Sequence, residues 1–182
     1  LRDLAAAGGK GDVFCVDYGT QVVRRYSSGG ELVAMSDRVD YLSELLIYAG
    51  ELFATAPRGL LFKIDPATLK PIGHVAIPNT GDWTVNGLAA DSHGVIHVAC
   101  SSMGRVYSFT SDLQPLWEWG DFPERVHGRV AAADALGHVY LTCYVDGKPA
   151  IEQFECHGID SPPTRTGRVL LSRWTNSINT LC

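Results

Sequence analysis

Three polar residues of the sequence stand at comparable positions before a glycine and could converge in the folded chain. Asp3 and Asn86 each lie eight residues before such a glycine, and Arg129 is the nearest equivalent in a later segment. The oxygen atoms of Asp and Asn suit a hard divalent cation such as calcium, whereas an Arg would repel it. Because Asn followed by Gly is also a common turn former, two interpretations of Asn86 stay open: a turn residue, or a metal ligand.

Histidine and cysteine offer the other side chains with reactive potential. His127, which directly precedes a glycine, is the histidine whose position suits a place beside Arg129. His97 stands within an apolar pattern, so we expect it to pack and hydrogen-bond inside the protein. The cysteines in apolar strand patterns should be buried and behave as small hydrophobic residues: Cys15, Cys100 and Cys143. The sequence contains no C-x-x-C, G-x-S-x-G, H-E-x-x-H or phosphate-binding loop.

The composition is that of an ordinary soluble globular protein, with 46% hydrophobic and 19% charged residues among 182. A protein that binds nucleic-acid backbones needs a basic surface, so the net charge of −5 argues against nucleic acid as a partner. No apolar run approaches the ~18 residues of a membrane-spanning helix. The chain begins with Leu1, which suggests processing or truncation, and the missing N-x-[ST] sequon gives only a slight preference for an intracellular location.

A repeat built on glycine turns organises the whole chain. Four glycines, each followed by an apolar strand pattern, are separated by 39, 44 and 43 residues: Gly11, Gly50, Gly94 and Gly137. Three residues after these glycines the chain carries a mostly aromatic column: Phe14, Phe53, His97 and Tyr140. This period matches the roughly 40–45 residues of a four-stranded propeller blade. A β-sandwich, the alternative for many short strands, would not repeat the same columns.

Each repeat contains four strand patterns, so the sequence predicts about sixteen strands and almost no helix. The fourth strand is expected at "PLWEW" from Pro115 in the third repeat and at "GRVLLSRW" from Gly167 in the fourth. Small residues, as in "GLAAD" and "RVAAAD", precede the glycines of the repeats, as expected where the first strands of a propeller crowd around its axis. The second repeat departs from this pattern with the larger "SELLIYA". We therefore predict a single all-β propeller domain over residues 1–182, with blades at about 1–40, 41–84, 85–125 and 126–182.

The third repeat, "NGLAADSHGVIHVACSSMGRVYSFTSDLQPLWEWG", resembles an NHL repeat. The segment "GDVFCVDYGTQVVRRYSSGGELV" is similar and keeps Asp17 where the family has an Asp, whereas Cys100 and Cys143 replace that residue in later repeats. NHL-type propellers normally have six blades. The resemblance therefore implies either an incomplete six-bladed propeller or a closed propeller of four blades.

Related gluconolactonase and strictosidine-synthase-like propellers also carry the "NGL" motif. In the lactonases, the Asn of this motif binds a divalent metal at the channel mouth, and Asn86 matches that position. The resemblance thus implies an alternative function: a metal-dependent lactonase- or synthase-like hydrolase that uses calcium or a similar cation. Because strands of this kind begin at the channel mouth, Asp3, His127 and Arg129 are expected near Asn86.

The set of metal ligands is incomplete, because it offers one carboxylate, one amide and a repelling cation. We therefore expect a non-enzymatic binding or scaffolding module, without a cofactor, that recognises a protein or peptide partner or belongs to a larger assembly. Trp117 and Trp119 lie on one side of an expected outer strand, separated by Glu118. They either fill the core between blades or form part of a partner surface, where Trp is enriched.

Overall fold

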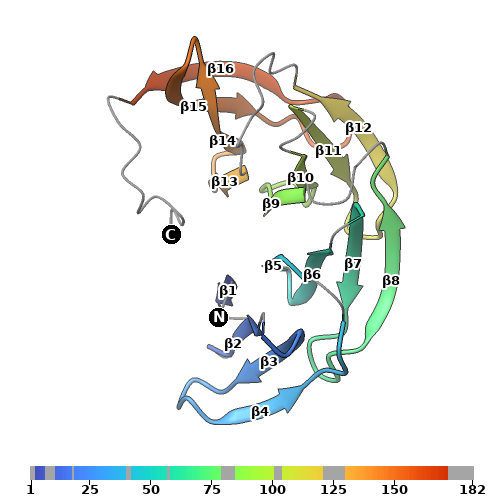
Figure 1. Ribbon diagram of the computed structural model, residues 1–182. Helices are drawn as coiled ribbons and strands as arrows, with labels where there is room; N and C mark the ends of the chain where they lie inside the picture. The colour runs from blue at the N-terminus through green and yellow to red at the C-terminus, as the bar shows by residue number, and fades with distance from the viewer. Residues whose placement is uncertain are drawn as a thin grey trace. The chain divides into compact units, whose positions relative to one another are not determined.

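The computed structural model describes residues 3–6, 11–17, 19–39, 42–56, 58–78, 85–100, 104–120 and 130–171. These residues form sixteen β-strands in four antiparallel sheets (Figure 1), and they contain no helix. The all-β fold expected from the repeats is therefore confirmed. Within the described ranges there is accordingly no helix of the length and hydrophobicity needed to span a membrane.

The chain divides into two compact units, Leu1–Val85 and Asn86–Cys182, which we call unit 1 and unit 2. Each of the four sheets lies within one of the expected blades and is made of four consecutive strands. That the two units act as a single domain stays a prediction.

Unit 1 contains two sheets, in which every strand pairs with the next along the chain. The first sheet comprises β1 (Asp3–Ala6), β2 (Val13–Asp17), β3 (Val22–Tyr26) and β4 (Leu32–Met35). The second comprises β5 (Glu44–Tyr48), β6 (Glu51–Ala56), β7 (Leu60–Ile64) and β8 (Pro71–Ala76). Strand β1 lies against β5. The core of this unit accommodates larger residues of the second repeat: Leu42 and Leu45 are both buried in it.

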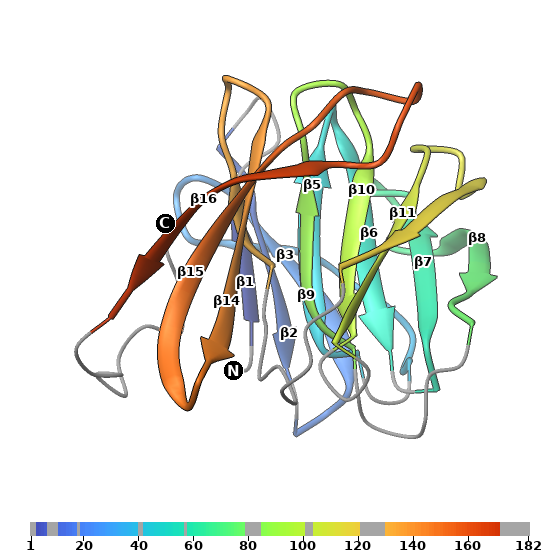
Figure 2. The same ribbon diagram turned by 90° about the horizontal axis from the view of Figure 1, so that it is seen from above.

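Unit 2 has the same arrangement. Its first sheet comprises β9 (Val85–Ala90), β10 (Ile96–Cys100), β11 (Arg105–Phe109) and β12 (Pro115–Trp119). Its second comprises β13 (Val130–Ala133), β14 (His138–Val145), β15 (Lys148–Glu155) and β16 (Thr164–Leu170). Figure 2 shows the long, curved β15 beside β14. The sequence predicted β16 from Gly167, but it begins at Thr164, because Thr164 and Arg165 already pair with the end of β15.

The repeated glycines close the turn between the first two strands of each sheet. All four have positive φ, between 77° and 88°, a conformation that glycine adopts without steric cost. In the two sheets of unit 2, an Asp three residues earlier completes the turn: the N–H of Gly94 donates to the carbonyl of Asp91, and that of Gly137 to the carbonyl of Asp134. The same backbone geometry thus recurs wherever the sequence repeats Asp-x-x-Gly.

The core of each unit lies between its two sheets and draws apolar side chains from both. In unit 1 it joins Phe14 and Val23 of the first sheet to Leu52 and Ile64 of the second. In unit 2 it joins Val106 and Trp119 of the first sheet to Val139, Leu141 and Phe154 of the second. Burial of both faces explains why strands such as β10 are apolar at nearly every position.

The fourth strand of each sheet is an edge strand, and each of these strands contains one shift in register. In all four cases the register with the preceding strand shifts by one residue, as in a β-bulge. In β4 the unpaired residue is Val33, and in β8 it is Ile72. Bulges of this kind bend an edge strand and hinder pairing with other chains, so this protective feature is common to all four sheets.

Candidate functional site

A group of hydrogen-bonded polar side chains is buried in unit 2. It begins at Asp91, in the turn between β9 and β10. The Oδ1 atom of Asp91 accepts hydrogen bonds from the backbone N–H groups of His93 and Val95, each at 2.9 Å. Burial alone would raise the pKa of this carboxyl, but the hydrogen bonds from His97 and from the backbone outweigh burial and lower the pKa below its usual value. Asp91 is therefore held as a carboxylate in one orientation.

A chain of hydrogen bonds connects Asp91 to the outer strand of the same sheet. The Nε2 atom of His97, in β10, lies 3.3 Å from Asp91 Oδ2, and its Nδ1 atom lies 2.9 Å from the Oγ of Ser108, in β11. Ser108 Oγ accepts a hydrogen bond of 2.7 Å from the indole N–H of Trp119, in β12. We call Asp91, His97, Ser108 and Trp119 the polar relay. It spans all four strands of the sheet, from the end of β9 to β12.

The residue types of the polar relay are those of an acid–base site, but its side chains are buried as in a structural network. His97 is completely buried, and Asp91 and Ser108 are each 1% exposed. A general base must reach a proton of its substrate, which such burial prevents. The ring of His97 also packs edge-on against Trp119, with centroids 5.7 Å apart. We therefore interpret the relay as a brace that satisfies buried polar groups while it holds the strands in register.

Cys156 approaches the relay from the second sheet of unit 2. It follows β15 directly, and its Sγ atom lies 3.8 Å from His97 Nε2. Burial, followed by the negative charge of Asp91, raises the pKa of this thiol to about 12. The thiol is therefore protonated at neutral pH and does not act as a nucleophile there.

The second sheet of unit 2 carries a partly exposed counterpart of Asp91, which is Asp134. Asp134 Oδ1 accepts hydrogen bonds from the backbone N–H groups of Leu136 and His138, each at 2.9 Å. Its Oδ2 accepts the hydroxyl of Tyr140 at 2.8 Å and lies 3.0 Å from His138 Nδ1. The backbone hydrogen bond from His138, together with the side-chain bonds, lowers the pKa of Asp134 to about 2.

Replacing Asp134 with Asn is expected to lower the stability of unit 2 at neutral pH but to have little effect in strong acid. Because the pKa of Asp134 in the folded protein lies below the ordinary value of 3.8, the contribution of the carboxylate to stability is present above about pH 4 and is lost as the pH falls toward 2. Urea unfolding of the wild type and Asp134→Asn at pH 7 and pH 2.5 measures this. The control is Asp160→Asn, in an exposed turn. An equal loss of stability for Asp134→Asn at both pH values would contradict a stabilising role of the Asp134 carboxylate.

Of the four residues predicted from sequence to lie at a metal site, the structure describes the backbone positions of two. Asp3 opens β1 in unit 1, and Asn86 is the second residue of β9 in unit 2. Only their backbone positions are described, and His127 and Arg129 lie outside the described residues. The metal site at Asn86, and the hydrolase function that it implies, stay predictions.

Trp117 and Trp119 occupy the same side of β12, as expected from their spacing. Trp119 is buried, packs against Phe154 at a centroid distance of 4.8 Å, and donates its N–H to Ser108. Trp117 is half-buried and packs against the same core. The sequence left two roles open for Trp119, core filling or part of a partner surface. The structure shows core filling, because the indole N–H has its hydrogen-bond partner inside the sheet.

The burial expected for three cysteines is confirmed for Cys15, Cys100 and Cys143, and Cys156 is buried as well. The expected packing of His97 is confirmed as well. Sequence reasoning missed the rest of the relay. The available signals were the single His in an otherwise aromatic column and the Asp of the Asp-x-x-Gly turn six residues before it.

Comparison with known proteins places the chain in a structural class. No protein-family model and no curated protein matches the sequence. Among solved structures, virginiamycin B lyase from Staphylococcus aureus matches over 90% of this chain with a TM-score of 0.69 and 15% identity. The WD40 domain of Toxoplasma gondii coronin matches over 93%, with a TM-score of 0.68 and 10% identity. The β-propeller domain of Cps50 (Swd1) from Myceliophteria thermophila matches over 93%, with a TM-score of 0.67 and 8% identity.

These likenesses show that the chain has the β-propeller fold. The chain spans about half of each matched structure: 54%, 47% and 59%, respectively. At identities of 15% or less the likeness extends to the fold alone, so it assigns neither the activity of the lyase nor any role of the other proteins. The propeller expected from the NHL-like repeats is thus confirmed, while NHL membership itself stays a prediction.

Proposed function

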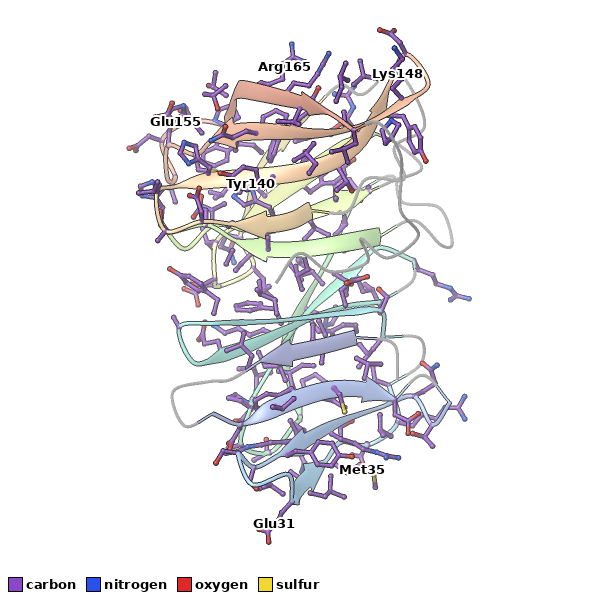
Figure 3. All side chains as sticks on the ribbon, turned by 90° about the vertical axis from the view of Figure 1, so that its left-hand side faces the viewer. Glu31, Met35, Tyr140, Lys148, Glu155 and Arg165 are labelled. Carbon is purple, nitrogen blue, oxygen red and sulfur yellow. The ribbon has the colours of Figure 1, made fainter. Side chains whose placement is uncertain are left out.

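We propose that this chain is a protein-binding β-propeller module whose partner adds a strand to the open edge of β4. The observation that carries the proposal is the exposure of three apolar side chains on this four-residue strand. Leu32, Val33 and Met35 are 55%, 53% and 58% exposed. Figure 3 shows Glu31 and Met35 at the outer margin of the sheet formed by β1–β4.

Strand β4 has backbone groups available for such pairing. It is the last strand of its sheet and pairs with β3 on one side. An edge strand of this kind presents N–H and C=O groups on its other side, which an extended peptide segment can bind by hydrogen bonds. The exposed side chains of β4 would then contact alternate apolar side chains of the added strand.

The other three edge strands carry additional features that discourage pairing. Strand β8 begins with Pro71 and contains Gly73, and β12 begins with Pro115. Strand β16 carries Arg165 and Arg168, which form ion pairs with the buried Glu152. Prolines and charged residues are the usual means by which proteins protect sheet edges. The sequence of β4, Leu-Val-Ala-Met, contains none of them.

The environment of β4 indicates a partner segment that is mainly apolar rather than acidic. The two arginines of the adjacent β3 are already paired: Arg24 with Asp17 at 2.7 Å, and Arg25 with Asp12. Their charges are therefore offset within the sheet. Main-chain hydrogen bonds would supply the affinity for such a segment, and its apolar side chains would supply the specificity.

A photo-crosslinking residue at Val33 is expected to capture one protein partner in the cells that make this protein. The matched control is the same residue at Ile72, the exposed bulge position of β8. Capture at position 33 should be lost when Leu32 and Met35 are both changed to Glu, without a change in melting temperature. Equal capture from the two positions, or none from position 33, would overturn the proposal.

A further inference from the structure

Cys156 lies beside the polar relay, but the hydrogen bonds of the relay do not depend on it. Hydrogen bonds already connect Asp91, His97, Ser108 and Trp119 without it. Yet its Sγ atom faces the same nitrogen of His97 that faces Asp91. Asp91, His97 and Cys156 each offer one ligand atom, all three side chains are buried, and these atoms lie within 4.8 Å of one another. One carboxylate, one imidazole and one thiol therefore converge on a single point inside unit 2.

We propose that Asp91 Oδ2, His97 Nε2 and Cys156 Sγ bind a zinc ion. The mixed oxygen, nitrogen and sulfur donors suit this metal, which prefers Cys, His and carboxylate ligands. Calcium and magnesium take oxygen ligands and are disfavoured by a thiolate and an imidazole. The three ligands include neither a residue of β4 nor Asn86, and the inference does not rest on the proposed function.

Two of the three separations between donor atoms are close to those around a tetrahedral zinc ion, and the third, between Asp91 Oδ2 and Cys156 Sγ, is at most 4.8 Å. A hydrogen bond between an ionised Asp and a His is usually about 2.7–2.9 Å long, but the distance here is 3.3 Å. Metal–ligand distances of about 2.0–2.3 Å around zinc place neighbouring ligand atoms roughly 3.4–3.6 Å apart. The observed separations are 3.3 Å between oxygen and nitrogen and 3.8 Å between nitrogen and sulfur.

The surrounding hydrogen bonds already orient two of the three ligands. Two backbone N–H groups hold Oδ1 of Asp91, which leaves Oδ2 directed at His97. Ser108 can accept hydrogen bonds at Oγ from both His97 Nδ1–H and Trp119 Nε1–H, because a hydroxyl oxygen has two lone pairs. With the proton on Nδ1, the lone pair of Nε2 is free to bind a metal. Outer hydrogen bonds of this kind are typical of zinc-binding histidines.

Charge balance also favours a divalent cation at this point. A zinc ion bound by one carboxylate and one thiolate gives a site without net charge, which is suited to burial. Binding requires that the thiol proton of Cys156 leave for the solvent, as is usual for cysteine ligands of metals. Because Cys156 follows β15 while Asp91 and His97 belong to the first sheet, the ion would join the two sheets of unit 2.

Titration of the metal-free chain with Co²⁺, which replaces zinc in such sites and gives a cobalt–thiolate absorption band, tests the inference directly. The expected result is one bound ion per chain, its displacement by Zn²⁺, and a higher melting temperature with Zn²⁺ than with a chelator. Cys156→Ser is expected to lose the charge-transfer band. Cys100→Ser, which removes a buried cysteine of β10 outside the cluster, should retain it.

Two outcomes would overturn the zinc site. The first is folded wild-type protein that gives no thiolate band and shows the same melting temperature with zinc and with chelator. The second is a Cys156→Ser variant that binds Co²⁺ with an unchanged spectrum. If Cys156→Ser does not fold, the wild-type titration and the metal content of the purified chain still decide the question.

Discussion

Replacing His97 with Ala is expected to destabilise unit 2 by about 3–5 kcal/mol, the usual range when one partner of a buried polar pair is removed. His97 is fully buried and contacts Asp91, Ser108 and Trp119. Its loss leaves the buried Asp91 carboxylate without its side-chain partner and removes one neighbour of the Trp119 ring. Hydrogen bonds of this kind are costly to break because the groups left behind are shielded from water.

Urea unfolding, followed by tryptophan fluorescence and by hydrogen exchange over residues 86–171, measures this loss. The matched control is His138→Ala, which also removes a His from an Asp–His pair, but one that is partly exposed to solvent. For such a pair we expect a change of less than about 1 kcal/mol. Equal losses for the two variants would mean that the polar relay does not brace the sheet.

Replacing Phe53 with Ala is expected to cost about 3–5 kcal/mol, the second of the two largest effects. Phe53 is completely buried in β6 of unit 1, where neighbouring strands flank it at Leu46 and Lys63. The substitution removes a whole aromatic ring and leaves a cavity, because close-packed sheets relax only in part.

The loss should appear first as faster hydrogen exchange in residues 44–64, which form β5, β6 and β7. Phe62→Ala serves as the control, since Phe62 is only half-buried in β7 and lies beside the exposed His74. A loss for Phe62→Ala as large as that for Phe53→Ala would contradict the assignment of Phe53 to the core.

The strands and turns could be read from sequence because they depend on near neighbours in the chain. Short apolar runs bounded by turn residues specify strands, and a glycine with positive φ is required where each repeated turn closes. The prediction of β12 at "PLWEW" was therefore correct at both ends. The start of β16 was missed, because backbone pairing with β15, rather than local composition, extends that strand to Thr164.

The residues of the polar relay could be predicted from the sequence only in part. Asp91 and His97 are six residues apart and belong to one hairpin, so their proximity follows from the repeat. Ser108 and Trp119 come from the next two strands, and each looks ordinary in isolation. From the sequence, Trp119 and its neighbour Trp117 could equally have belonged to a surface. Only the hydrogen bond to Ser108 and the packing against Phe154 place Trp119 in the core.

By itself, the sequence determined that this protein is a repeat of four-stranded antiparallel sheets, because short apolar runs and glycine turns are local properties. Only the tertiary structure decided which polar groups meet. Cys156 lies 59 residues from His97 along the chain, yet its sulfur faces the same imidazole nitrogen as Asp91. The packing of one sheet against the other brings these atoms together. No pattern within a single repeat predicts the contact between Cys156 and His97, because this contact depends on the distance between the two sheets.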